Sequence, residues 1–301
     1  MPTTAVSPRR MAWARRRRSL THFLRQFRSD RAGMVGVAVL VLFVVVALAA
    51  PLLFSSDELR ASAGRGEPTL ALPSSEHWLG TDEIGRDLLA QLVWGSRISL
   101  FIGLVGTLVA VTIGSLVGVT AGFFGGRIGG ALMAVDDWFL VIPFLPLAIV
   151  LAAVLGSSAM ILAVVIGVTS WAGSGRILRA QVLSAKERTF VERSRALGAG
   201  SWHVVSRHVL PQVAPLILAT ATLTVPAVIL SESALSFLGF GDRFRPSWGK
   251  MLDGALDSGA ITLNRWNYYL PPGLCIMAVV LAFTVIGRSL ERIFDPRLRG
   301  R

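Results

Sequence analysis

The chain has 301 residues, is 53% hydrophobic and carries charge on only 16% of them, with a formal net charge of +12. A soluble domain of this length needs more polar surface, and the apolar residues here are grouped in long blocks, as membrane spans require. The single cysteine, Cys275, lies inside one of these blocks, which excludes disulfides, thiol catalysis and cysteine metal sites.

The first predicted elements are a basic arm at residues 1–31 and an apolar helix at residues 32–54. The flanks resemble a secretory signal, because Arg17-Arg18 precedes the helix and Ala47-Leu48-Ala49 is similar to a cleavage site. The uncharged stretch nevertheless exceeds the roughly 7–15 residues of a signal core. We therefore expect this helix to be retained as the first membrane span.

Four further uncharged runs, which supply five spans, follow a segment at residues 55–97. Residues 98–126 form one run, and residues 138–175 form a longer one that Gly156-Ser157-Ser158 divides into two spans joined by a tight turn. Residues 209–230 and 266–287 supply the last two, at about 20 residues per crossing. Lipid leaves backbone groups unsatisfied in anything but helices and closed barrels, and these runs lack the alternation of barrel strands.

These runs predict an all-α polytopic membrane protein with six transmembrane helices. The five later helices make a core at residues 98–287, which contains a charged loop at residues 176–208 and is followed by a tail at residues 288–301. The arm, the turn at 125–130, the loop and the tail together hold 22 of the 30 basic residues. Since lysine and arginine mark cytoplasmic loops, we predict that both termini are cytoplasmic.

The same topology explains the basic balance of the chain. Positive cytoplasmic loops and attraction to anionic lipid headgroups account for the charge, and no soluble domain shows the aromatic and basic interleaving of a nucleic-acid partner. Residues 55–97 are expected outside the membrane. There, Thr81 or Asp82 is expected to cap a short helix whose apolar face, with Ile84 and Leu88, lies along the outer membrane surface.

The sequence offers few candidates for chemistry. No glycine-rich loop ends in Gly-Lys-Ser or Gly-Lys-Thr, so we expect no nucleotide bound in the P-loop manner, and the four scattered histidines predict no metal site. Asp136-Asp137 is the most prominent acidic pair, because carboxylates within a membrane are usually functional. Packing and catalysis by a membrane enzyme both remain open for it. Glu232 is expected at the outer interface, or else along a transport path.

The stretch from Phe190 to Pro215 is a basic, amphipathic island between apolar segments. We expect Ala180–Leu197 to form one helix and Ser201–Val209 a second, with a bend at Gly198 and Gly200. A short helix pair held just below the membrane is suited to a groove of another protein. A plain solvated loop is the alternative.

The island resembles the cytoplasmic loop with which permease subunits of bacterial ABC importers engage their ATPases. That loop usually reads Glu-Ala-Ala, three residues, Gly, nine residues, Ile, one residue, Leu-Pro. Glu192, Gly198, Leu210 and Pro211 stand at those spacings, whereas three positions depart from the pattern: Arg193, Ser194 and His208. The resemblance implies that the contact with the ATPase is made by Glu192, Arg193, Ser194, Arg195, Ala196, Leu197, Gly198, Ala199, Ser201, Trp202, His208, Leu210 and Pro211.

Other motifs narrow the resemblance to the dipeptide, oligopeptide and nickel importers. Residues 29–53 look like the added first helix of their second permease subunit, and residues 246–249 and 295–299 also fit, whereas Gly287-Arg288 stands where Gly-Asp is usual. The outer segment matches that group at Gly80, Thr81, Asp82, Gly85, Arg86 and Asp87.

The resemblance implies an assembly in the bacterial plasma membrane. This chain would adopt the type I importer permease fold and pair with a related permease, with the path between them. Two ATPase subunits would use ATP on the cytoplasmic side, and an extracytoplasmic binding protein would deliver a peptide or, alternatively, nickel. The chain itself would be neither an enzyme nor the holder of a cofactor or metal. Asp137 and Glu232 would then serve the path or the packing.

Overall fold

The computed structural model describes residues 21, 25–60 and 64–294. This part of the chain is helical, and its only β-type pairing is an isolated bridge between Thr81 and Asp87. Four continuous helices are long and apolar enough to cross a membrane. They are α2 (Arg31–Leu53), α3 (Leu88–Phe124), the helix that runs from Ser201 to Phe240, and α12 (Trp266–Phe294).

Two bent helix pairs bring the count to six if each pair is one span. One pair is α4 (Gly126–Val141) with α5 (Phe144–Leu155), bent by 91°, and the other is α6 (Ala159–Thr169) with α7 (Ala172–Lys186), bent by 46°. The turn at Gly156-Ser157-Ser158 separates the two pairs, as the sequence predicts. The remaining elements are η1 (Ser56–Leu59), α8 (Thr189–Ala196), α9 (Ser201–Val204), η2 (Val205–Val209), α10 (Leu210–Leu235), η3 (Ser236–Phe240) and α11 (Trp248–Asp257).

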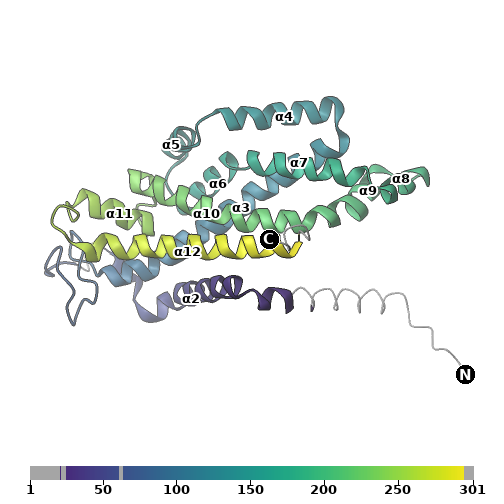
Figure 1. Cartoon of the computed structure of the whole chain (residues 1–301). Coiled ribbons are helices and arrows are strands. Elements are labelled where there is room, and N and C mark those ends of the chain that lie inside the picture. The colour runs from purple at the N-terminus through teal and green to yellow at the C-terminus, as the bar shows by residue number, and fades with distance from the viewer. Residues whose placement is uncertain (1–20, 22–24, 61–63, 295–301) are drawn as a thin grey trace, which may run out of the picture.

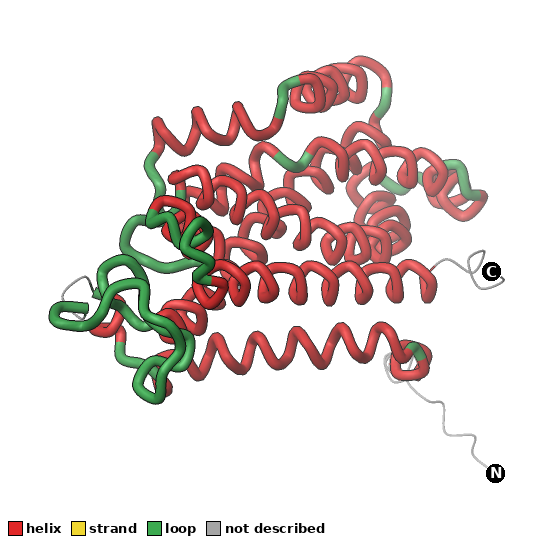
Figure 2. The backbone as a smooth tube through the Cα atoms, turned by 60° about the vertical axis from the view of Figure 1, so that its left-hand side comes forward, coloured by secondary structure: helices red, strands yellow, loops and turns green. Residues whose placement is uncertain are grey.

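The long helices run side by side, so the molecule has two ends (Figures 1 and 2). The terminal end carries the start of α2, the end of α12, and α8 with α9. The opposite end, here called the loop end, carries α11 and residues 64–87, which Figure 2 draws as green loops. The charge pattern predicts that the terminal end faces the cytoplasm.

Helix α3 lies at the centre of the bundle and packs against α6, α7 and α10. Glycines permit this close approach: a Cβ on Gly122 would lie 2.8 Å from Val182 Cβ of α7, and one on Gly106 would lie 2.8 Å from Val228 Cγ1 of α10. Without a hydrophobic force between helices in lipid, such small-residue contacts supply the packing. Nearby, buried Ile102, Leu162 and Val228 belong to one apolar cluster.

Three expected boundaries were wrong. There is no separate surface helix after Thr81, because Asp87 caps α3 and the fully buried Leu88 begins it, ten residues before the predicted span. The helix expected at Ala180–Leu197 is broken between α7 and α8. The second helix of the island does not stop at Val209, since α9, η2, α10 and η3 form one run of 40 residues that stays helical as far as Gly239, whose φ is +85°. Pro211 does not break this helix, and it lies directly after the wider π-helical turn η2.

Candidate functional site

The island at the terminal end forms a tight turn between α8 and α9. Gly198 has φ +84°, and the chain around it satisfies the last carbonyl groups of α8. The Ala199 N–H donates to Ser194 O at 3.1 Å, and the Gly198 N–H donates to Arg195 O at 2.9 Å. This is the Schellman arrangement, which favours glycine because only glycine adopts the left-handed conformation without strain. The predicted bend at Gly198 is therefore present.

One face of the turn is anchored in the bundle. Val191 of α8 and Val204 of α9 are fully buried and join a cluster with Val182 of α7. The Arg195 guanidinium lies 5.0 Å from the ring centroid of Phe123, which adds a cation–π contact to α3. The turn is therefore tied to α3 and α7 and not a free solvated loop.

The opposite face of the turn is exposed. Leu197 is 88% exposed and Trp202 is 82% exposed, on either side of Gly198. Glu192, Arg193 and Arg195 are exposed beside them. Exposed aromatic and arginine side chains on a fixed backbone are the features of a protein-binding surface.

The other predicted contact residues divide between this face and its support. Ser194, Ala199 and His208 are half-buried, and the His208 ring lies 5.9 Å from that of Phe190 and 5.8 Å from that of His203. His208 therefore packs between α8 and α9 where a branched apolar residue is usual. The remaining members of the set are exposed: Ala196, Gly198, Ser201, Leu210 and Pro211.

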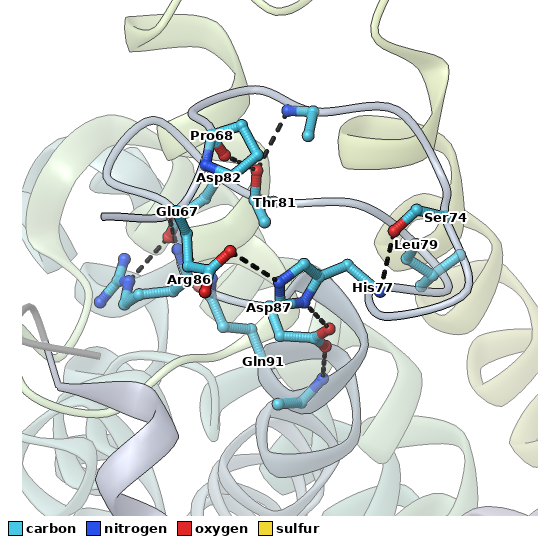
Figure 3. A network of polar contacts seen from close by, with 12 residues as sticks. Glu67, Pro68, Ser74, His77, Leu79, Thr81, Asp82, Arg86, Asp87 and Gln91 are labelled. Carbon is cyan, nitrogen blue, oxygen red and sulfur yellow. Dashed lines mark hydrogen bonds and ion pairs between the residues drawn. The ribbon is translucent and has the colours of Figure 1, made fainter. Parts of the chain in front are cut away.

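At the loop end, Asp82 organises the predicted outer motif (Figure 3). Its carboxylate is fully buried and accepts hydrogen bonds from Arg86 Nε and Gln91 Nε2, each at 2.7 Å. It also accepts from the backbone N–H groups of Ile84 at 3.0 Å and Arg86 at 2.8 Å. Four donors around one carboxylate fold residues 82–91 into a compact structure that closes the end of α3.

The rest of the motif fastens the outer segment to the bundle. Thr81 Oγ1 accepts from the Ala71 N–H at 3.0 Å, and Asn267 of α12 donates to Ala71 O at 3.2 Å and Leu79 O at 2.8 Å. Gly80 has φ +77° and contacts Ala71 and Asn267 too closely for a side chain. Gly85 has φ +85°. The motif residues thus have structural contacts in this chain.

His77 joins this network, and no sequence pattern indicates its partners. In Figure 3 its ring lies between Glu67 and Asp87, with Nδ1 2.8 Å from Asp87 Oδ2 and Nε2 3.6 Å from Glu67 Oε2. Asp87 also accepts from the Ala90 N–H at 2.7 Å and so caps α3. The hydrogen bond with Asp87 raises the pKa of His77 above its usual value, with Glu67 adding to the effect and partial burial opposing it.

Comparison with known proteins identifies the family of the chain. Residues 114–300 match the family described as "Binding-protein-dependent transport system inner membrane component". The chain belongs to this family. Residues 20–64, which include α2, match the "N-terminal TM domain of oligopeptide transport permease C". This match confirms the prediction of an added first helix.

The named relatives align with almost the whole length of the permease. The oligopeptide permease OppC of Bacillus subtilis is 35% identical over 91% of this chain and 88% of OppC. The dipeptide permease DppC of the same organism is 36% identical over 91% of this chain and 85% of DppC. OppC of Escherichia coli K12 is 35% identical over 91% of this chain and 90% of that protein. The chain is therefore an inner-membrane ABC permease subunit.

A solved structure confirms the permease fold. A chain of the MetNI methionine ABC transporter in an inward-facing conformation superposes with a TM-score of 0.50 and 20% identity, over 68% of this permease and 97% of that chain. The match supports the predicted type I permease fold.

Within the core of the permease, the acidic pair on α4 contacts an arginine on α7. Asp136 is fully buried and accepts from Arg176 Nε at 3.2 Å and Nη2 at 3.1 Å. Arg176 also pairs with Asp137, which is exposed. Among the described residues no group of three or more acidic, histidine or cysteine side chains is placed to hold a metal. The geometry is that of a contact between α4 and α7, as the packing alternative requires.

Glu232, which the sequence places at the outer interface or along a transport path, is buried inside the described part of the chain. Its side chain is fully buried between α10, α3 and the start of α11. Ser236 Oγ donates to it at 2.7 Å and Ser99 Oγ at 3.3 Å, and Ser99 Oγ in turn accepts from the Trp248 N–H at 3.2 Å. Because its two hydroxyl donors come from η3 and α3, Glu232 serves as a polar anchor at the loop end of the permease.

Proposed function

We propose that this permease forms half of the translocation path of an ATP-driven importer and that the α8–α9 turn receives movement from a separate ATPase subunit. The observation that carries the proposal is the turn itself, with Val191 and Val204 buried and Leu197 and Trp202 exposed. A surface held rigidly by the bundle can transmit displacement, whereas a solvated loop would absorb it.

The connection between the turn and the membrane supports this role. Helix α9 continues without a break through η2 into α10, so a force on Trp202 acts directly on a helix that crosses the membrane. ATP-dependent closure of the ATPases would favour one arrangement of this helix over another. Such a shift requires different affinities for the two arrangements, which nucleotide-dependent contacts at the turn supply.

We propose an assembly of two different permeases, two ATPase subunits and an extracytoplasmic binding protein. In this assembly the ATPase subunits would bind ATP, and this chain would bind no cofactor. Its topology would place both termini and the loop at residues 176–208 in the cytoplasm. The family description names binding-protein-dependent transport, and the solved relative belongs to an ABC transporter.

Di- and oligopeptides are the proposed cargo. The support is the agreement of the relatives, which are named as oligopeptide and dipeptide permeases. Competition uptake with labelled dipeptides, longer peptides and nickel in cells that contain the whole transporter tests the choice. Uptake of nickel without uptake of peptides would contradict the proposal for cargo and leave the coupling role intact.

Two substitutions test the coupling role. Gly198→Asp strains the turn and Glu192→Arg reverses a charge on its exposed face, so each should abolish uptake while the subunit stays in the membrane. Unchanged uptake and unchanged coupling to ATP hydrolysis in both variants would overturn the role. The double substitution Asp136→Asn with Asp137→Asn tests the alternative that the chain is a membrane enzyme. Such an enzyme would have an activity that does not depend on any ATPase, and it would lose that activity in the double variant.

A further inference from the structure

The ion pair between α4 and α7 leaves one buried oxygen without a partner. Asp136 is fully buried and receives both of its hydrogen bonds from Arg176 on one oxygen, Oδ2. The other oxygen, Oδ1, is also buried and has no hydrogen-bond partner among the residues that the structure describes. The α7 residue beside this oxygen is Gly175, on which a Cβ would lie 3.2 Å from Oδ1. An unpaired carboxylate oxygen in the interior costs free energy and requires an explanation.

A second arginine of α7 has the complementary deficit. Arg179 lies three residues after Arg176 on the same side of the helix, near enough for its charge to act on Asp136. Its Nε atom is buried without a hydrogen-bond partner in the described part of the chain, and none of the ion pairs found there includes Arg179. Helix α7 therefore offers two arginines, one turn apart, to a single acidic pair.

Helix α4 is held to the bundle by a narrow contact. Of its 16 residues, Gly129, Met133 and Asp136 alone are buried. It lies at the edge of the bundle, next to the 91° bend that leads into α5 (Figure 1). Elements that move during a conformational change are drawn from those with few buried contacts. Helix α4 is therefore suited to change its position relative to α7.

Helix α7 is joined to the α8–α9 turn. It ends at Lys186, α8 begins at Thr189, and Val182 of α7 belongs to one buried cluster with Val191 and Val204 of the turn. A displacement of the turn by an ATPase would therefore carry α7 with it and slide α7 past α4.

We propose that Arg176 and Arg179 are alternative partners of the acidic pair in the transport cycle. Asp136 and Asp137 bind Arg176 in the arrangement described here and bind Arg179 in the other. The two arginines are about 4.5 Å apart along the helix axis, at 1.5 Å per residue, so a movement of one turn or less exchanges them. Packed elements switch between discrete arrangements by shifts of this size. This inference rests on the proposed function, because it requires that an ATPase moves the turn.

Basal ATP hydrolysis by the whole complex in lipid nanodiscs tests the exchange, with Arg176→Gln and Arg179→Gln as the two variants. Each variant weakens the arrangement in which its arginine is paired, so the balance between the two should shift about fivefold or more, in opposite directions. ATP hydrolysis should therefore rise in one variant and fall in the other. Arg176→Lys keeps the charge and should remain closer to the unaltered complex than Arg176→Gln. Arg127→Gln is the matched control, since Arg127 is an exposed arginine on α4 outside the acidic pair.

Thermal unfolding separates the exchange from a purely structural role. Arg176→Gln leaves the Asp136 carboxylate unpaired in one arrangement only, and Arg179→Gln does so in the other. With and without a non-hydrolysable ATP analogue, each variant should therefore lower the melting temperature of a different state of the complex. Arg179→Gln gives this test by itself if Arg176→Gln fails to assemble, because it should spare one state and lower the other.

The outcomes separate this inference from the proposed function. If both variants change ATP hydrolysis in the same direction, or both behave like Arg127→Gln, the exchange is wrong. Equal loss of melting temperature in both states for Arg179→Gln would also overturn it. The proposed function stands in these cases as long as the unaltered complex couples ATP hydrolysis to uptake. If the unaltered complex does not couple them, both are wrong.

Discussion

Replacing Gly198 with alanine isolates the conformation of the α8–α9 turn from its contacts. No atom lies within 4 Å of the Cβ that alanine would add, so the substitution creates no clash. Its cost arises from φ +84°, where a residue with a side chain loses about 1–2 kcal/mol. That loss corresponds to about a 5–30-fold change in the balance between the ordered and the opened turn.

Gly200 provides the matched control for this prediction. It is also exposed and has no atom within 4 Å of an added Cβ, but its φ of −67° suits any residue. Hydrogen exchange of residues 189–204 in the whole complex should accelerate about 5–30-fold for Gly198→Ala and by less than about twofold for Gly200→Ala. ATP-driven uptake should fall only in the first. Equal behaviour of the two variants would refute the role assigned to the left-handed glycine.

Three further predictions concern the loop end and the core. Asp82→Ala removes a buried carboxylate that accepts four hydrogen bonds, and it leaves the Arg86 guanidinium with its bond to Leu59 O but without its ion-pair partner. Thermal unfolding of the purified complex should therefore reveal a loss of about 3 kcal/mol in stability, whereas Asp57→Ala, at an exposed pair, should have little effect. Because the pKa of His77 is raised in the folded state, the contribution of His77 to stability is complete below about pH 6.5 and is lost as the pH rises through the raised pKa. The protease resistance of residues 64–87 should therefore fall from about pH 5.5 to about pH 8.5. His77→Gln should abolish that pH dependence. Gly122→Ala places a Cβ 2.8 Å from Val182 and should cost about 1–3 kcal/mol by separating α3 from α7, whereas Gly130→Ala, with nothing within 4 Å, should not lower the melting temperature.

The sequence was sufficient for the class of fold and for the position of the turn. Uncharged runs of known length identify spans because lipid permits few alternatives, and Gly198 could be located because a helix end of this type requires a left-handed residue. The family resemblance gave the added first helix, which the match of residues 20–64 confirms.

The boundaries and the polar contacts were beyond the sequence. Membrane thickness determines where an apolar run ends but not where a helix ends, so α3 extends ten residues past the predicted span to a cap at Asp87. The burial of Glu232 depends on hydroxyl groups from Ser99 and Ser236, which lie 133 and 4 residues away along the chain. The Glu67–His77–Asp87 contact likewise depends on the path of a loop that has no periodic pattern.

The most direct test of the account is cross-linking from the α8–α9 turn to the ATPase subunit. Cys275 is the only cysteine, so Cys275→Ala gives a background in which Leu197→Cys and Trp202→Cys carry single labels. A short bifunctional reagent should join positions 197 and 202 to the ATPase, more strongly in one nucleotide state than in another, while a cysteine at Leu72 of the outer segment should not react with it. Absence of ATPase adducts from both positions in an intact, transporting complex would contradict the coupling role.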